Sequence, residues 1–226
     1  MTSSRTAILE SIRRAHGRGD LSADRQQALR DRLKAHPAAT IPARSAGDQD
    51  HRITLFTDMV TAVDGTVDRI SGWDALPQAV GNWLKSRNLP TTLAIAPDPR
   101  LDAVAVHPLY TVHRGAALPE DLIGLSIAEA GIAETGSLML VSGPETPTSL
   151  NFLPDVHIIA LPASALVGPF EEAWARLRTR FPDGLPRTVN LITGPSRTGD
   201  IEQTLLLGAH GPRQLHVVIV DDVPSA

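Results

Sequence analysis

From about residue 50 onward, short apolar runs alternate with longer segments whose apolar residues recur at helical spacing. One such segment begins at Asp50 and ends at Asp64-Gly65, and a strand-like run, 66–70, follows it. The other predicted strands are 93–95, 123–126, 137–141, 157–161, 188–193 and 215–220, and the other predicted helices are 73–87, 169–181 and 200–207. This alternation is typical of an α/β fold. We therefore expect one central sheet, with 137–141 among its strands and helices outside it.

The first part of the chain has a different pattern. Ile8, Leu9 and Ile12 fall on one face of a predicted helix that ends near residue 16, and a second helix is predicted from about 22 to 36. Residues 37–50 mix Pro, Ala, Ser and Gly without periodicity. We therefore predict an N-terminal helical extension and linker at 1–49, followed by the main domain at 50–226.

Charge and hydrophobicity argue against several partners. The chain has 226 residues, with 21 Lys and Arg against 25 Asp and Glu and no basic run. Nucleic-acid or anionic-membrane binding would need a basic patch, so neither is expected. The N-terminus lacks the apolar core of a signal peptide, and no apolar stretch reaches the roughly 18 residues of a membrane span. We expect a cytoplasmic protein.

Cysteine is absent from the sequence. Disulfides, thiol nucleophiles and self-ligated iron–sulfur or thiolate zinc centres are therefore not expected. His157 and His216 lie in strand-like apolar runs and are interpreted as core residues. A metal site formed by these two and His210 is conceivable, but no metal-ligand spacing supports it, and we predict no metal.

Three glycine-anchored loops, 133–136, 194–202 and 208–213, carry most of the candidate chemistry. Glycines let the backbone approach a ligand closely, and amides near a helix start together with Arg197 would favour an anion. His210 lies between two glycines and is the best imidazole candidate. The predicted ligand-binding residues are Thr135, Gly136, Gly194, Ser196, Arg197, Thr198, His210 and Gly211.

Two alternatives stay open for the charged residues of these loops. Glu134 could act as a nucleophile or general base, and it is the predicted catalytic residue, or it could bond backbone amides in its turn. Arg197 could bind an anion or pair with Asp200 or Glu202, which themselves are expected to cap a helix. Serine-hydrolase, phosphate-loop and dinucleotide-binding signatures are absent.

Four ordered motifs connect the sequence to a known family: GIAETGSL at 131–138, LPDVHI at 153–158, GPSRTGDIE at 194–202 and GAHGP at 208–212. Over roughly residues 50–220 the chain resembles the LUD-domain family, and within it the lactate utilization protein C (LutC) group. The family often carries a basic residue just before the second motif, whereas this chain reads PTSLNF at 147–152. That difference removes one expected anion contact.

The resemblance implies a three-layer α/β sandwich similar to the NagB/RpiA/CoA transferase-like fold. It also implies a role in oxidising L-lactate to pyruvate together with LutA-like and LutB-like iron–sulfur proteins. Because the chain has no cysteine, the resemblance implies that it binds no cofactor itself and that the iron–sulfur clusters belong to the partner proteins. A small carboxylate or phosphate is the expected ligand.

Two other functions are compatible with these residues. The Glu134-Thr135-Gly136 turn resembles the Glu-Asn-Gly turn of CoA transferases, so a free-standing enzyme acting on a CoA thioester or a sugar phosphate is one alternative. Shared fold does not transfer chemistry, however. The other alternative is an interaction scaffold whose loops only cap and turn the sheet.

Overall fold

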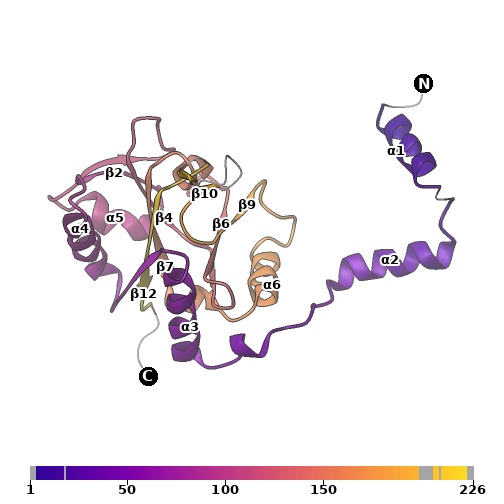
Figure 1. Ribbon diagram of the computed structural model, residues 1–226, viewed down its shortest axis with the longest axis horizontal. Helices are drawn as coiled ribbons and strands as arrows, with labels where there is room; N and C mark the ends of the chain where they lie inside the picture. The colour runs from indigo at the N-terminus through magenta and orange to yellow at the C-terminus, as the bar shows by residue number, and fades with distance from the viewer. Residues whose placement is uncertain (1–3, 18, 199–205, 209, 223–226) are drawn as a thin grey trace. The chain divides into compact units, whose positions relative to one another are not determined.

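The computed structural model describes residues 4–17, 19–198, 206–208 and 210–222, and it divides the chain into two units, Met1–Thr40 and Ile41–Ala226. The first unit contains two helices, α1 (Ser4–Ala15) and α2 (Ala23–Ala35), drawn in Figure 1. Ser22 caps α2 by accepting a hydrogen bond from the amide of Arg25 at 3.4 Å. Neither helix contains a buried residue, and both predicted helices are confirmed.

The second unit is built around a six-stranded parallel sheet. Its strands are β1 (Thr66–Ile70), β2 (Thr92–Ile95), β3 (Thr111–Arg114), β4 (Ile123–Ile127), β7 (Val156–Pro162) and β12 (Gln214–Val220). The spatial order is β1-β12-β7-β4-β2-β3, and every neighbouring pair is parallel. From β2 the chain moves outward to β3 and then returns to β4 on the other side of β2. The chain thus leaves β2 towards one side of the sheet and leaves β4 towards the other side. The carboxyl ends of these two neighbouring strands are therefore the topological switch point.

A second sheet has four strands in the order β8-β5-β6-β9. These strands are β5 (Ala130–Ile132), β6 (Ser137–Val141), β8 (Leu166–Val167) and β9 (Val189–Ile192). The β6 strand pairs antiparallel with both β5 and β9. The prediction that 137–141 joins the central sheet is therefore wrong. Both faces of β6 are buried, and a strand buried on both faces reads in sequence like a central parallel strand.

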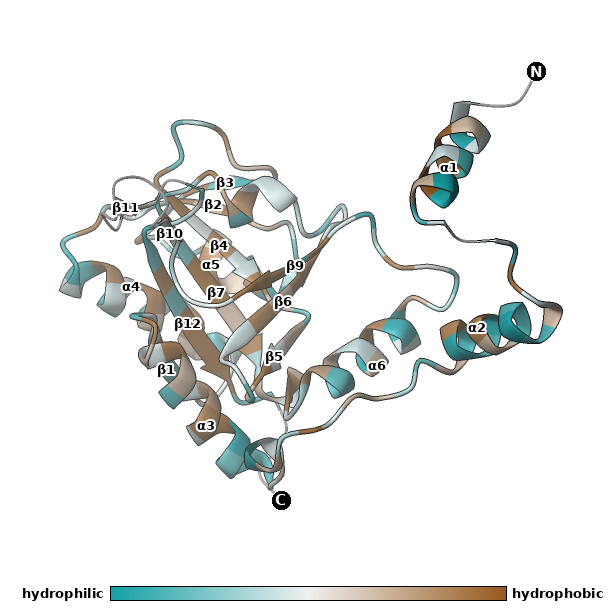
Figure 2. Ribbon diagram, turned by 45° about the vertical axis from the view of Figure 1, so that its right-hand side comes forward, coloured by the Kyte–Doolittle hydropathy of each residue, from teal (hydrophilic) through white to brown (hydrophobic). Residues whose placement is uncertain are grey.

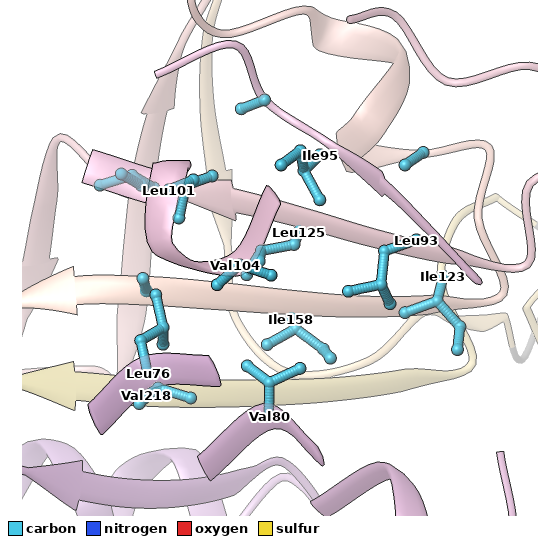
Figure 3. Close-up of a cluster of buried hydrophobic side chains, with 14 of the residues drawn as sticks. Leu76, Val80, Leu93, Ile95, Leu101, Val104, Ile123, Leu125, Ile158 and Val218 are labelled. Carbon is cyan, nitrogen blue, oxygen red and sulfur yellow. The ribbon is translucent and has the colours of Figure 1, made fainter. Parts of the chain in front are cut away.

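The helices and the second sheet cover the two faces of the six-stranded sheet. Helices α4 (Leu76–Ser86) and α5 (Asp102–Ala105) pack on one face, and the hydrophobic cluster beneath them is shown in Figure 3. That cluster includes Leu76, Val80, Leu93, Ile95, Leu101, Val104, Ile123, Leu125, Ile158 and Val218. Side chains alternate along a strand, so within β7 Ile158 points to this cluster and Ile159 to the opposite one.

The opposite face is covered by α3 (Gln49–Thr61) and by the second sheet, whose outer side packs against α6 (Phe170–Arg180). Figure 1 shows α4 and α6 on opposite sides of the two sheets, and Figure 2 shows hydrophobic residues along the central strands. The three-layer α/β fold with an N-terminal helical extension is confirmed. None of the helices in the described ranges combines the length and hydrophobicity that a bilayer crossing requires.

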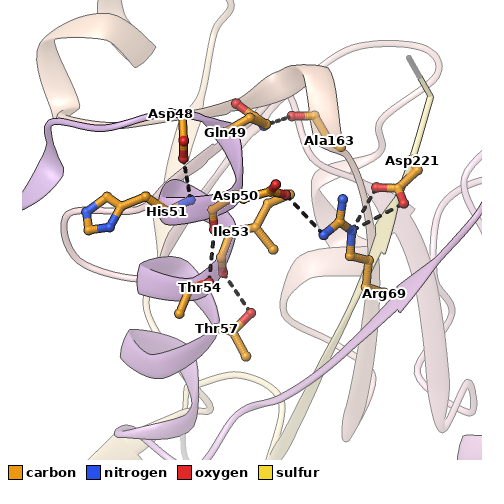
Figure 4. Close-up of polar contacts among 10 residues, drawn as sticks. All are labelled: Asp48, Gln49, Asp50, His51, Ile53, Thr54, Thr57, Arg69, Ala163 and Asp221. Carbon is orange, nitrogen blue, oxygen red and sulfur yellow. Dashed lines mark hydrogen bonds and ion pairs between the residues drawn. The ribbon is translucent and has the colours of Figure 1, made fainter. Parts of the chain in front are cut away.

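Polar contacts fix the start of α3 (Figure 4). Asp48 caps the helix by accepting a hydrogen bond from the amide of His51 at 2.9 Å. Gln49 donates to the carbonyl of Ala163 at 2.5 Å. Arg69 of β1 pairs with Asp50 at 3.4 Å and with Asp221, directly after β12, at 2.9 Å. These contacts attach α3 to the ends of two sheet strands.

Other differences from the sequence predictions concern short or half-exposed elements. The proline-rich segment 97–108, in which neither a helix nor a strand is predicted from the sequence, contains α5, and β3 follows it. The predicted buried strand at 188–193 is β9, which is half-exposed because it is the edge of the second sheet. Most of the predicted helix 200–207 lies outside the described residues. Its last two residues form β11 (Leu206–Leu207), which pairs antiparallel with β10 (Arg197–Thr198), so they are not helical.

Candidate functional site

A cavity of about 420 Å³ lies between the second and third predicted loops, and we name it the glycine-loop cavity. It is lined by Val63, Asn151, Phe152, Leu191, Ile192, Thr193, Gly194, Pro195, Ser196, Arg197, His210, Gly211 and Pro212. Five predicted ligand-binding residues are therefore brought together: Gly194, Ser196, Arg197, His210 and Gly211. The cavity lies at the amino ends of the parallel strands, because Phe152 shortly precedes β7 and Pro212 shortly precedes β12.

Backbone hydrogen bonds hold the two loops of this cavity together. Ser196 donates its amide to the carbonyl of Pro212 at 2.8 Å, and its own carbonyl accepts from the amide of Gly208 at 3.1 Å. The Ser196 hydroxyl accepts from the amide of His210 at 3.3 Å. Gly194 has φ +75°, and a Cβ there would meet Val63 Cγ2 at 2.7 Å. A glycine is required at this turn for both reasons.

Arg197 forms an ion pair with Asp64, which lies in the turn between α3 and β1. The Asp64 side chain is 75% exposed and that of Arg197 is 38% exposed, so solvent screens the pair and the guanidinium stays accessible from the cavity. The sequence-based alternatives for the partner, Asp200 and Glu202, lie outside the described residues. The backbone of Thr198 pairs with Leu206 in the β10–β11 ladder.

The first predicted loop lies apart from this cavity. Glu134 accepts a hydrogen bond at 3.3 Å from the amide of Phe170, the first residue of α6, and its own amide donates to the carbonyl of Gly168 at 3.0 Å. It does not line the glycine-loop cavity. The structure thus places Glu134 at the start of a helix, where a carboxylate stabilises exposed amides. Glu134 therefore does not share this cavity with Arg197 and His210.

The other two residues of that loop have structural partners. Thr135 contacts the Ser137 hydroxyl at 2.7 Å, and Ser137 contacts the Thr193 hydroxyl at 2.6 Å. Since Thr193 lines the glycine-loop cavity, Thr135 is connected to it through two hydroxyl groups. Gly136 has φ +66° and packs so tightly on α3 that a Cβ would lie 2.7 Å from the amide nitrogen of Val60. Neither Thr135 nor Gly136 lines the cavity.

The two strand histidines are buried, as interpreted from sequence. His157 Nε2 lies 2.7 Å from the Ser126 hydroxyl, and His216 Nδ1 lies 2.9 Å from the Thr66 hydroxyl. Burial lowers the pKa of each imidazole to about 3, so both are neutral at physiological pH. Within the described ranges, no three His, Asp or Glu side chains are grouped so that they could hold a metal ion.

A second cavity, of about 340 Å³, contains charged residues that the sequence reasoning missed. It lies where β2 and β4 end, and we name it the switch-point cavity. Its charged lining residues include Asp98, Arg100, Glu129 and Arg180, and its apolar lining residues include Ile127, Ala128 and Val141. The available signal was Glu129 itself, a single acidic residue inside the apolar run 123–133. A lone charge in such a run indicates a buried, paired group.

Comparisons with known proteins agree with the motifs. Residues 120–220 match the sequence model of the LUD domain. An uncharacterized protein of Neisseria meningitidis serogroup B is 43% identical over 97 residues, which is 43% of this chain and 41% of that protein. Lactate utilization protein C of Exiguobacterium sp. is 38% identical over 103 residues, 45% of each chain. The protein of the same name from Bacillus licheniformis is 34% identical over 102 residues, 44% of this chain and 42% of that one.

The matched region spans less than half the length of these curated relatives. A crystal structure of a DUF162 family protein from Deinococcus radiodurans superimposes with a TM-score of 0.56 at 21% identity, and covers 77% of this chain and 99% of that one. This similarity supports the fold. Residues 120–220 of the chain therefore match the LUD domain, and this region is similar to proteins named lactate utilization protein C.

Proposed function

We propose that the chain is a cluster-free component of a lactate-utilization system. The observation that carries this proposal is the similarity of its LUD domain to relatives named lactate utilization protein C. In this system, L-lactate loses two electrons and two protons to become pyruvate, and the electrons pass to iron–sulfur clusters in LutA-like and LutB-like partner proteins. The absence of cysteine supports the assignment of the clusters to the partners.

The glycine-loop cavity gives this component a binding role for a small carboxylate or phosphate. Arg197 brings a guanidinium that can form two parallel hydrogen bonds with such an anion. An anion would compete with Asp64 for Arg197. Because the Asp64 side chain is mostly exposed, breaking its ion pair with Arg197 costs little free energy. Exposed His210 can add a further hydrogen bond.

Growth on L-lactate tests the biological role. A host that depends on its own relative of this chain should lose growth on L-lactate when that gene is deleted, and should regain it with the wild-type chain. Arg197→Ala should restore growth poorly, while Arg178→Ala, an arginine on α6 outside both cavities, should restore it fully. Normal growth of the deletion strain, with no substitute gene present, would contradict the proposed role.

Ligand-induced stabilisation tests the binding role separately. A ligand present at a hundredfold over its dissociation constant stabilises a protein by about 2.7 kcal/mol, which a thermal shift detects readily. L-Lactate, pyruvate or phosphate should raise the melting temperature of the wild type more than that of Arg197→Ala. Equal shifts in both proteins would contradict ligand binding in the glycine-loop cavity. The growth experiment would still test the role in lactate utilization separately.

A further inference from the structure

The switch-point cavity lies at the edge of the sheet where open α/β folds bind their ligands. Asp98 and Arg100 follow the end of β2, and Glu129 follows the end of β4. The strand order reverses between these two strands. Loops that leave a parallel sheet at such a reversal run in opposite directions and leave a crevice between them. The glycine-loop cavity lies at the amino ends of the strands of the same sheet, so the two cavities are separate sites.

Two carboxylates form the buried part of this cavity. The Glu129 side chain is only 3% exposed, pairs with Arg180, and lies 3.8 Å from Arg176. The Asp98 side chain is 6% exposed and accepts hydrogen bonds from Arg100 Nη2 at 2.7 Å and Nε at 3.0 Å. Burial alone would raise the pKa of Asp98, but the hydrogen bonds from Arg100 outweigh it and the pKa is lowered. This carboxylate is therefore charged.

The arginines are the accessible half of these ion pairs. The Arg100 side chain is 44% exposed and that of Arg180 is 52% exposed. Among the described residues, Arg100 Nη1 and Arg180 Nε and Nη2 have no hydrogen-bond partner. The buried carboxylates thus fix the direction of two guanidinium groups whose remaining N–H donors are available to a ligand. Burying charges in pairs adds little net stability, so stability alone does not account for this arrangement.

The charged and apolar residues of the switch-point cavity indicate which ligand it can bind. Arg100 pairs with Asp98, and Glu129 is shared by Arg180 of the lining and Arg176 outside it, so both buried carboxylates are neutralised. Glu145 also lines the cavity but is exposed, where solvent screens it. Ile127, Ala128 and Val141 add an apolar wall. A single negative charge on a short apolar body complements these features, and the volume suits a small molecule.

We propose that the switch-point cavity binds a small organic monocarboxylate. Its carboxylate accepts hydrogen bonds from Arg100 and Arg180, and its carbon chain packs against Ile127 and Val141. Glu129 and Asp98 act as positioning residues that hold the two guanidinium groups. The proposal rests on the geometry of this cavity and does not depend on the lactate role proposed above.

Titration calorimetry with the full chain carrying Arg197→Ala tests the proposal, because this variant lacks the guanidinium of the glycine-loop cavity. The probes are butyrate, L-lactate and pyruvate, with butyramide and lactamide as neutral molecules of the same shape and inorganic phosphate as an anion without a carbon chain. Carboxylates should bind at least tenfold more tightly than the matching amides, and butyrate more tightly than phosphate. Equal binding of acid and amide, or tighter binding of phosphate, would overturn the assignment.

Variants locate the binding. The double variant Glu129→Gln and Arg180→Gln removes the guanidinium without leaving a buried carboxylate unpaired, and Arg180→Lys keeps the charge but loses the planar fork. Added to Arg197→Ala, either change should weaken butyrate binding at least tenfold, while Arg178→Ala, on α6 outside both cavities, should leave it unchanged. Should the double variant fail to fold, Arg180→Lys decides the question. Unchanged butyrate affinity in the Arg180 variants would refute the site.

Discussion

His216 of β12 stacks on Trp83 of α4, with ring centroids 4.5 Å apart and planes inclined by 11°. The Trp83 indole N–H donates to the Thr66 hydroxyl at 3.1 Å, and the same hydroxyl lies 2.9 Å from His216 Nδ1. One hydroxyl of β1 thus joins a helix to the adjacent strand. Because the stacked imidazole is fully buried, its protonation is coupled to the stability of the whole domain.

Stability should fall on mild acidification. Burial holds the pKa of His157 and His216 at about 3 in the folded protein, against about 6.5 when unfolded. Above the unfolded pKa both states are neutral and pH has no effect through these groups. Between pH 6.5 and 3 the unfolded chain binds protons that the folded protein does not, so each histidine lowers the free energy of unfolding by up to about 1.4 kcal/mol per pH unit.

Urea denaturation at several pH values from 7.5 to 4.5 measures this effect. His157→Gln and His216→Asn replace each ring with an amide that can keep the hydrogen bond to Ser126 or Thr66. Each variant should show a shallower loss of stability with acid than the wild type. An unchanged slope in both would mean that the buried imidazoles do not control the pH dependence.

Gly136→Ala should destabilise the protein by more than about 1 kcal/mol, because φ is +66° and the new Cβ would collide with the backbone of α3 at Val60. Gly72→Ala is the matched control, since its φ of 165° is extended and a Cβ there meets nothing within 4 Å. The control should keep or slightly raise the stability. Equal unfolding midpoints in the two variants would contradict the close packing of Gly136 on α3.

Glu134→Ala should cost about 1 kcal/mol, because the amide of Phe170 at the start of α6 loses its acceptor. The residue before it, Pro169, makes no capping side-chain bond that could replace it. Glu134→Gln keeps an acceptor oxygen and should lose less than half as much in chemical denaturation. An acyl adduct on Glu134 after incubation with acyl-CoA, seen by mass spectrometry, would instead support the enzyme alternative.

Removal of Met1–Thr40 should leave the stability of Ile41–Ala226 unchanged to within about 0.5 kcal/mol, because α1 and α2 contain no buried residue. Urea unfolding of the full and shortened chains makes the comparison. A clear drop in the midpoint of the shortened chain would show that the first unit stabilises the second. Loss of partner binding with unchanged stability would assign the helices to protein contact.

Hydrophobic periodicity predicted the long helices and strands, because the burial of each follows one regular pattern along its length. The β1 and β12 strands appear within one residue of their expected bounds, and α3 begins one residue early and ends three residues early. Periodicity could not show that β6 belongs to the second sheet. A strand that is buried on both faces, as β6 is, has the same apolar pattern in a parallel and in an antiparallel sheet. Its partner β9 is distant in sequence, and pairing across such a distance leaves no local signal. Strands of two or three residues, such as β5 and β8, are too short to show a period.

In the candidate site, too, local sequence predicted some features, and others depended on tertiary packing. Glycines at 194 and 211 led to the prediction of two ligand-binding loops, and Arg197 and His210 of these loops line one cavity. The position of Glu134 depended on where α6 begins relative to β5, which is a tertiary relationship. Glu129 was missed because its partners Arg176 and Arg180 come from a helix about 50 positions later, and only packing brings them together.

The position of β12 between β1 and β7 has a consequence for synthesis of the chain. β1 and β7 both pair with β12 and not with each other, and Thr66 and His216, which face each other in the β1–β12 pair, are 150 residues apart. At translation rates of 5–20 residues per second, β1 waits on the order of 10 s outside the ribosome before its partner emerges. During that interval the nascent chain exposes open strand edges, which are the kind of surface that chaperones protect.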